Sequence, residues 1–182
     1  MIMMLPRPIR LVMAVSLAMA SLAAASRRHD PLTEKEVDDI REAAQDANQR
    51  LKLYIKFTQA RFLALEQMRV DPNLAAGRGS RLHDLLEDIA SLVSEINDNV
   101  DAYSKQNADL RKPLGLLIPA VSDWQLRLRT LKDATSSDPQ IQRESKDFYF
   151  ALDGAIDAVN SLAENARDTL SEQNEAHSKK KK

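Results

Sequence analysis

Apolar residues recur at every third or fourth position along most of this chain, and prolines interrupt the recurrence. This spacing places the apolar side chains on one face of an α-helix. Five prolines fall where a helix is expected to begin, end or bend: Pro31, Pro72, Pro113, Pro119 and Pro139. The chain has four glycines in 182 residues, too few for the many tight turns of a β-sandwich or β-barrel. We therefore expect an all-α fold in a single domain.

The first predicted helix opens with a capping box. Thr33 is the expected N-cap, and Glu36 stands three residues later, so each side chain can bond the other residue's backbone N–H. The apolar stripe that follows contains no glycine or proline, and we predict one long helix from Glu34 to Arg69. Members of this stripe are Val37, Ile40, Ala44, Ala47, Leu51, Ile55, Thr58, Phe62 and Leu65.

Three more stripes predict three more helices. The second stripe holds Leu82, Leu85, Ile89, Leu92, Ile96, Val100, Tyr103 and Leu110, and the third holds Leu114, Leu117, Val121, Trp124, Leu128 and Leu131. The fourth follows an Asp138-Pro139 start and holds Ile141, Ser145, Phe148, Leu152, Ala155, Val159, Leu162 and Ala166. We favour an elongated antiparallel bundle of four helices. The alternative is three long helices with the middle one kinked at Pro113 and Pro119, because the second and third stripes share one phase.

Charge patterning predicts how the first two helices pair. The second half of the first helix is basic, and the part of the second helix that would face it in an antiparallel hairpin is acidic. The expected neighbours are Arg61 with Glu87 or Asp88, Lys56 with Glu95, and Lys52 with Asp98, while the acidic start of the first helix faces Arg111 and Lys112.

Both ends of the chain differ in composition from the middle. Residues 1–25 have a basic start, an apolar run and a small-residue end at Ala23-Ala24-Ala25, which is the pattern of a cleaved secretory signal peptide. An uncleaved anchor is the alternative, although the run covers only about 22 Å of a ~30 Å hydrocarbon core. We expect one helical-bundle domain over residues 26–176 and a disordered lysine-rich tail over residues 177–182, with weak contact between that tail and an anionic membrane surface as an option. The expected location is the periplasm or the cell exterior, with no transmembrane segment after signal removal.

Few residues offer chemistry. The chain has no cysteine and a net charge of −1, which argues against thiol chemistry and against nucleic acid as a partner. We interpret His83, one turn before Glu87, as a surface side chain rather than a metal ligand. Residues 97–101 are rich in oxygen but fall within a helix, so we interpret them as a solvated face rather than a calcium loop. Asn107 is predicted to be a buried residue that fixes register. We expect no catalytic residue, no cofactor and no metal.

Two helices carry apolar residues outside their stripes. Leu53 and Phe57 form a second line on the first helix, and Phe150 points nearly opposite Phe148 on the fourth. Either both helices are touched on two sides by neighbours, or these positions form an interaction surface. We treat Leu53, Phe57 and Phe150 as that candidate surface and predict that Phe57 and Phe150 lie in one region.

The favoured function is a non-catalytic binding or structural role for a secreted or periplasmic bundle, with a protein partner of unknown identity. An enzyme is disfavoured because paired acids such as Asp38-Asp39 alternate with bases along exposed faces. The alternative is suggested by Leu32-Thr33, which resembles the start of the Leu-Thr-x-x-Gln signature of small Spy-type periplasmic chaperones, with Glu36 in place of glutamine and no second copy. That resemblance implies an extracytoplasmic chaperone that binds unfolded chains.

Overall fold

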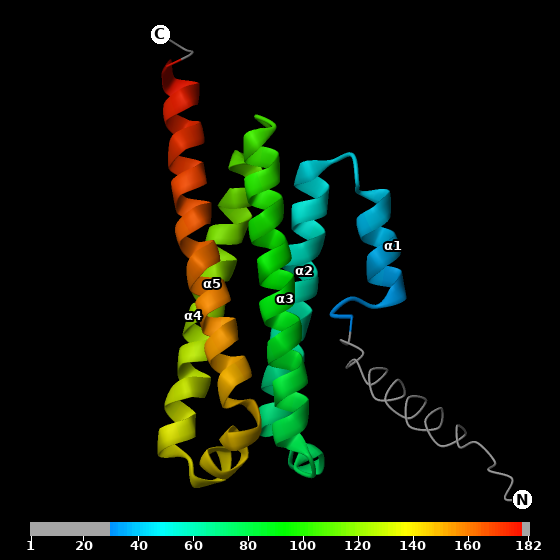
Figure 1. The fold of residues 1–182 in the computed structure, drawn as a ribbon, viewed down its shortest axis with the longest axis vertical. Helices are drawn as coiled ribbons and strands as arrows, with labels where there is room; N and C mark the ends of the chain where they lie inside the picture. The colour runs from blue at the N-terminus through cyan, green and yellow to red at the C-terminus, as the bar shows by residue number, and fades with distance from the viewer. Residues whose placement is uncertain (1–29, 180–182) are drawn as a thin grey trace, which may run out of the picture.

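A computed structural model describes residues 30–179, so the predicted signal segment and residues 180–182 lie outside the described residues. The helices are α1 (Glu34–Glu42), α2 (Ala47–Val70), α3 (Arg78–Lys105), α4 (Arg111–Ser137) and α5 (Pro139–Lys179), with one 3₁₀ turn at Pro72–Leu74 (Figure 1). The described part of the chain contains no strand. The all-α prediction is therefore confirmed.

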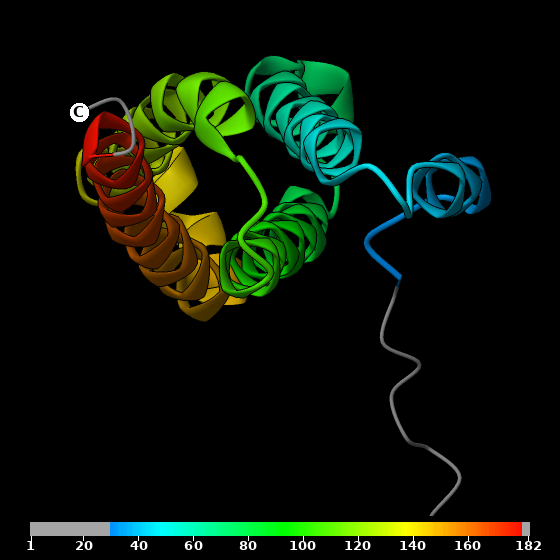
Figure 2. The ribbon, with the colours of Figure 1, turned by 90° about the horizontal axis from the view of Figure 1, so that it is seen from above.

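Four helices form an elongated bundle, as favoured from the sequence. The closely packed neighbours are α2 with α3, α3 with α5, α5 with α4, and α4 with α2. Seen from above, α3 and α4 lie on one diagonal of the bundle, and the loop between them crosses its end (Figure 2). Two antiparallel hairpins, α2–α3 and α4–α5, thus lie side by side, so that α3 runs parallel to α5. The alternative of three long helices is wrong.

Asn107 explains why α3 ends before the apolar stripe does. Its φ of 59° is left-handed, a conformation that asparagine tolerates better than most residues. The Asn107 N–H donates to the Ser104 carbonyl at 2.9 Å, and the Ala108 N–H donates to the Tyr103 carbonyl at 3.0 Å. These two bonds close the helix as a Schellman motif. Asn107 is exposed, so the prediction of a buried register residue is wrong. Pro113 lies in the first turn of α4, where a helix needs no N–H donor.

Replacement of Asn107 by valine is expected to lower the free energy of unfolding by about 1–2 kcal/mol, because a β-branched residue is strained at positive φ. Replacement by glycine should leave stability nearly unchanged, since glycine adopts this conformation freely. Chemical denaturation of both variants measures the difference. Equal stability of the valine and glycine variants would argue against the left-handed helix end.

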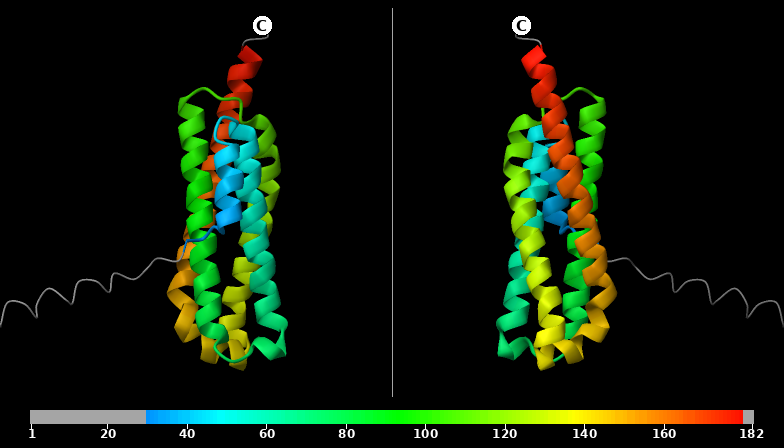
Figure 3. Two further views of the ribbon diagram at one scale, coloured as in Figure 1. Left: turned by 90° about the vertical axis from the view of Figure 1, so that its right-hand side faces the viewer. Right: turned by 90° about the vertical axis from the view of Figure 1, so that its left-hand side faces the viewer.

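The single first helix predicted from Glu34 to Arg69 is wrong, because the chain reverses between α1 and α2. Ala43 ends α1, and the Asp46 carboxylate caps α2 by accepting from the Gln49 N–H at 3.0 Å. The helix α1 then lies outside the bundle, packed against α2 (Figure 3). The reversal buries Ile40 and forms an ion pair between Glu36 and Arg61, neither of which local helix propensity can predict.

The core follows the predicted stripes along the bundle. Trp124, Phe62 and Phe148 are the largest fully buried side chains, and the Trp124 and Phe62 rings stack at 5.6 Å with an interplanar angle of 12°. At the lower end in Figure 1, α3 approaches α5 so closely that a Cβ on Gly79 would lie 2.5 Å from Asp147 Oδ2. At the other end α5 continues to Lys179 and extends beyond its neighbours (Figure 1). Residues 177–179, expected to be disordered, are therefore helical.

Candidate functional site

The three residues of the predicted interaction surface do not lie on one surface. Phe57 is buried with 4% of its surface exposed, whereas Phe150 is 86% exposed. Leu53 is half-buried against the core. Because α2 and α5 occupy opposite corners of the bundle (Figure 2), the prediction that Phe57 and Phe150 share one region is wrong. The burial of Phe57 agrees with the alternative in which neighbouring helices contact its helix, α2, on two sides. Phe150 remains on the outer surface of α5.

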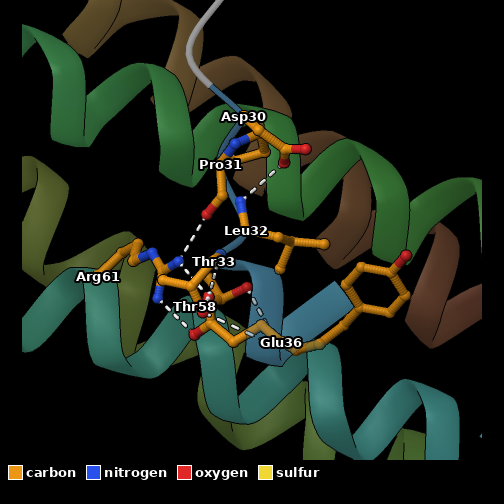
Figure 4. A network of polar contacts seen from close by, with 8 residues as sticks. Asp30, Pro31, Leu32, Thr33, Glu36, Thr58 and Arg61 are labelled. Atoms are coloured by element: carbon orange, nitrogen blue, oxygen red, sulfur yellow. Dashed lines mark hydrogen bonds and ion pairs between the residues drawn. The ribbon is translucent and has the colours of Figure 1, made fainter. Parts of the chain in front are cut away.

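A clasp of polar groups fastens α1 to α2 (Figure 4). Arg61 donates to Glu36 Oε1 at 2.7 Å and to Glu36 Oε2 at 2.6 Å, and it also donates to the Pro31 carbonyl at 2.6 Å. The predicted capping box is present, because the Thr33 N–H donates to Glu36 at 2.8 Å while the Glu36 N–H donates to the Thr33 hydroxyl oxygen at 3.3 Å. The side chains of Arg61 and Glu36 are only 15% and 14% exposed. The Glu36 carboxylate therefore both caps the start of α1 and binds α2 through Arg61.

The clasp changes the proton affinity of both ionised groups. Burial pushes the pKa of Glu36 upward, but the bonds from Arg61 and Thr33 outweigh it, so the net pKa lies below the usual value of 4.5. The hydrogen bonds to Glu36 raise the pKa of Arg61, burial opposes this shift, and the charges of Glu36 and Asp88 add to it. Both groups are therefore held in their charged forms at neutral pH.

Acid should release the clasp. A carboxyl whose pKa is lowered on folding contributes stability above its unfolded pKa, and this contribution is lost as the pH falls through the folded value. We expect amide chemical shifts around Thr33 and Glu36 to titrate with a midpoint below pH 4.5, and NMR measures this directly. The Glu36→Gln variant should lack the transition. A wild-type midpoint at or above 4.5 would contradict a charge-stabilised clasp.

The predicted pairing of the first two long helices is confirmed in direction and in part of its detail. The negative charge of Asp88 on α3 also raises the pKa of Arg61, so these two residues lie near each other, as expected. Burial raises the pKa of Tyr54, and Glu95 of α3 raises it further, so Glu95 lies near Tyr54, within one turn of its predicted neighbour Lys56. The ion pair of Arg61, however, goes to Glu36. The expectation that the acidic start of the first helix faces Arg111 is wrong, because α1 folds back on α2 and Arg111 pairs with Asp109.

An aromatic pair stands on the outside of α5. Tyr149 and Phe150 are both exposed, and their rings meet edge to face at 6.0 Å. Lys132 of α4 lies near Tyr149 and forms an ion pair with Asp153 at 2.9 Å. The sequence singled out Phe150 and gave no reason to single out Tyr149. This pair concentrates exposed aromatic surface at one place on the bundle.

A polar cleft of about 470 Å³ lies where the crossing loop meets the end of α5. Gln173 of α5 braces the loop, because its side chain donates to the Ala108 carbonyl and accepts from the Leu110 N–H, each at 2.9 Å. Arg111 donates to both carboxylate oxygens of Asp109 at 2.9 and 2.6 Å, and this holds the pKa of Asp109 well below its usual range. These groups bind one another, so the cleft wall serves to fix the loop.

A polar seam between α3 and α5 was missed by the sequence analysis. The Asn165 side-chain NH₂ donates to Asn97 at 2.9 Å and to Asp101 at 2.7 Å, and Asn165 accepts from the Thr169 hydroxyl at 3.2 Å. Asn97 and Asp101 are therefore not simply a solvated face. The sequence does place polar residues beside Ile96 on α3 and beside Ala166 on α5. They indicate a polar contact only when α3 and α5 are known to run parallel as neighbours.

Among the described residues, no three His, Cys, Asp or Glu side chains gather in a way that could hold a metal ion. His83 is half-exposed and lies 3.4 Å from Asp84 and 3.8 Å from Glu87. No helix in the described range is long and apolar enough to cross a membrane. Comparison of the chain with protein-family models, with curated proteins and with solved structures found no match.

Proposed function

We propose that this protein is an exported, non-catalytic helical module that binds another protein. The observation that carries the proposal is the aromatic pair Tyr149 and Phe150, because a phenylalanine that is 86% exposed contributes nothing to its own core. Aromatic side chains are enriched at the centres of protein interfaces, where covering them with a partner removes a large apolar area from water. The braced loop and the capped helices support a rigid module that presents this pair.

Export is the part of the proposal that rests on residues 1–25. Edman sequencing of the protein recovered from its native cell is expected to give an N-terminus at Ser26, since Ala23 and Ala25 fit the small-residue requirement of a signal peptidase. A product that retains residues 1–25 and is extracted only by detergent would replace export with membrane anchoring.

Partner binding is tested by affinity capture from the native cell envelope with three forms of the protein. The Phe150→Ser variant removes the exposed ring, and Leu126→Ser is the matched control because Leu126 is also exposed but lies on α4. We expect a protein that the wild type and the Leu126→Ser variant capture and that the Phe150→Ser variant loses. An identical set of captured proteins for all three forms would remove the aromatic pair as a binding site.

A chaperone role is the second candidate, favoured by further exposed apolar side chains on α2 and α4, which are Leu63, Val70, Leu116 and Leu126. A chaperone binds many unfolded chains through dispersed apolar surface rather than through one pair. Suppression of the aggregation of an unrelated denatured protein, equal for the wild type and the Phe150→Ser variant, would favour this candidate over the single-partner module.

A further inference from the structure

The helix α1 is an arm that is joined to the rest of the fold by few interactions. It has nine residues, packs closely against α2 alone among the helices that the structure describes, and is connected to α2 by residues 43–46. The four-helix bundle is complete without it, as the view from above shows (Figure 2). The bonds that fix its position are those of the clasp, in which Arg61 holds Glu36 and the Pro31 carbonyl (Figure 4).

The clasp sets the register between α1 and α2. Residues four apart on a helix share a face, so Phe57 lies on the face of Arg61 and Ile40 lies on the face of Glu36. Because α1 runs antiparallel to α2, the pairing of Glu36 with Arg61 places Ile40 opposite Phe57. Both side chains are buried, with 7% and 4% of their surfaces exposed. We infer that the arm covers Phe57, which accounts for its burial outside the apolar stripe of α2.

The connection between α1 and α2 is chemically suited to become helix. Residues 43–46 read Ala-Ala-Gln-Asp and contain no glycine or proline, and the apolar stripe keeps its phase through Ala44 and Ala47. The Asp46 cap is the local feature that favours the break. The same segment can therefore join α1 and α2 into one continuous helix, which carries the arm away from its own α2.

The register is self-complementary about its centre. With Glu36 opposite Arg61 and Ile40 opposite Phe57, the same spacing puts Ala44 opposite Leu53 and centres the pairing between Asn48 and Gln49. Two copies of a continuous helix over residues 34–70 can therefore lie antiparallel and remake every α1–α2 contact between copies. At this centre, Asn48 Oδ1 and Arg50 Nε are buried without hydrogen-bond partners, and the second copy would bring the polar groups of its own Asn48 and Gln49 to them.

We propose that α1 is an exchangeable arm and that its alternative partner is a second copy of this chain. In the exchanged dimer the arm of each copy packs against α2 of the other, and only the connection at residues 43–46 changes conformation. Such an exchange is a low-cost route to a dimer because the contacts of the monomer are reused. It needs high protein concentration, since the monomer forms the same contacts within one chain.

The first test uses a proline that is tolerated when α1 packs against α2 of its own chain and is not tolerated in the continuous helix of the exchanged dimer. Ala47 is the first residue of α2, where proline fits, and Asp46 before it is extended at φ −116° and ψ 99°, close to the region that a residue before proline prefers. In the continuous helix the same proline would be interior. Sedimentation of the purified full chain, concentrated, warmed and cooled, is expected to show a dimer of the wild type. Ala47→Pro should weaken this dimer by roughly 10,000-fold, because each of its two continuous helices then carries one interior proline.

The second test distinguishes an exchanged dimer from any other dimer by charge swapping. Glu36→Arg and Arg61→Glu each destroy the clasp within one chain. In a mixture of the two variants, each arm of an exchanged heterodimer meets the opposite charge on the other copy. One arm remakes the native pair of Glu36 with Arg61, and the other forms the same ion pair with its charges reversed. We expect the mixture to dimerise and each variant alone to do so far less. The Glu36→Arg/Arg61→Glu variant keeps a reversed ion pair but loses the bonds to Thr33 and to the Pro31 carbonyl, and we expect it to dimerise more than either single variant. A wild type that stays monomeric at the highest concentration reached, a mixture no more dimeric than its parts, or an Ala47→Pro variant that dimerises as the wild type would each overturn the exchange.

Discussion

Replacement of Trp124 by alanine is expected to lower the free energy of unfolding by about 3–5 kcal/mol. Trp124 is fully buried on α4 and stacks on Phe62 of α2 at 5.6 Å. Its indole N–H donates to the Gln59 side chain of α2 at 3.0 Å. Alanine would leave a cavity between the two hairpins and would remove the ring stacking and the hydrogen bond that Trp124 makes to α2. The thermal midpoint should fall by roughly 10 °C for a domain of this size.

The control for this prediction is Trp124→Phe, which keeps an aromatic ring against Phe62 and loses only the N–H donor. Gln59 is half-buried and can bind water instead, so the phenylalanine variant should lose less than about 1.5 kcal/mol. Circular dichroism follows the unfolding of all forms, because Trp124 is the only tryptophan of the chain. An alanine variant as stable as the phenylalanine variant would show that the packing between hairpins does not depend on this ring.

The sequence could predict the long helices because each one is specified locally. The stripe of α5 from Ile141 to Ala166 and its Asp138-Pro139 start have the period and the cap that a helix needs, and all the apolar members of the stripe are buried. The end of α3 was harder, because Asn107 stops the helix through a left-handed backbone conformation and not through glycine or proline. The spacing of apolar residues cannot predict this backbone conformation.

The arrangement of the helices and the clasp could not be predicted in the same way. The partner of Arg61 was expected on α3, where Asp88 does lie close, but the ion pair goes to Glu36 because the chain reverses at Ala43–Asp46. That reversal gains its stability from contacts between residues 25 positions apart, which helix propensity does not include. The diagonal crossing of α3 to α4 is likewise decided by how two hairpins fit together. Chain order alone does not determine which helices become neighbours.

Phe57 and Phe150 are expected to respond to the same substitution in opposite ways. Phe57→Ala should lower the free energy of unfolding by about 3–5 kcal/mol, because the Phe57 ring is buried and its removal leaves a cavity beneath α1. Phe150→Ala should change stability by less than about 0.5 kcal/mol, because water already surrounds that ring. Denaturant unfolding of the two variants beside the wild type measures both effects.

Because α1 covers Phe57, the Phe57→Ala substitution should destabilise α1 more than the other helices. A cavity beneath α1 weakens the docking of Ile40 and the clasp first, whereas α4 does not pack closely against α1. Amide hydrogen exchange in the Phe57→Ala variant should therefore accelerate most in α1 and less in α4. If exchange rises equally in both helices, Phe57 supports the whole core instead of the arm. If Phe57→Ala costs no more than Phe150→Ala, the burial of Phe57 contributes little to stability, and the arm is held by the Glu36–Arg61 clasp alone.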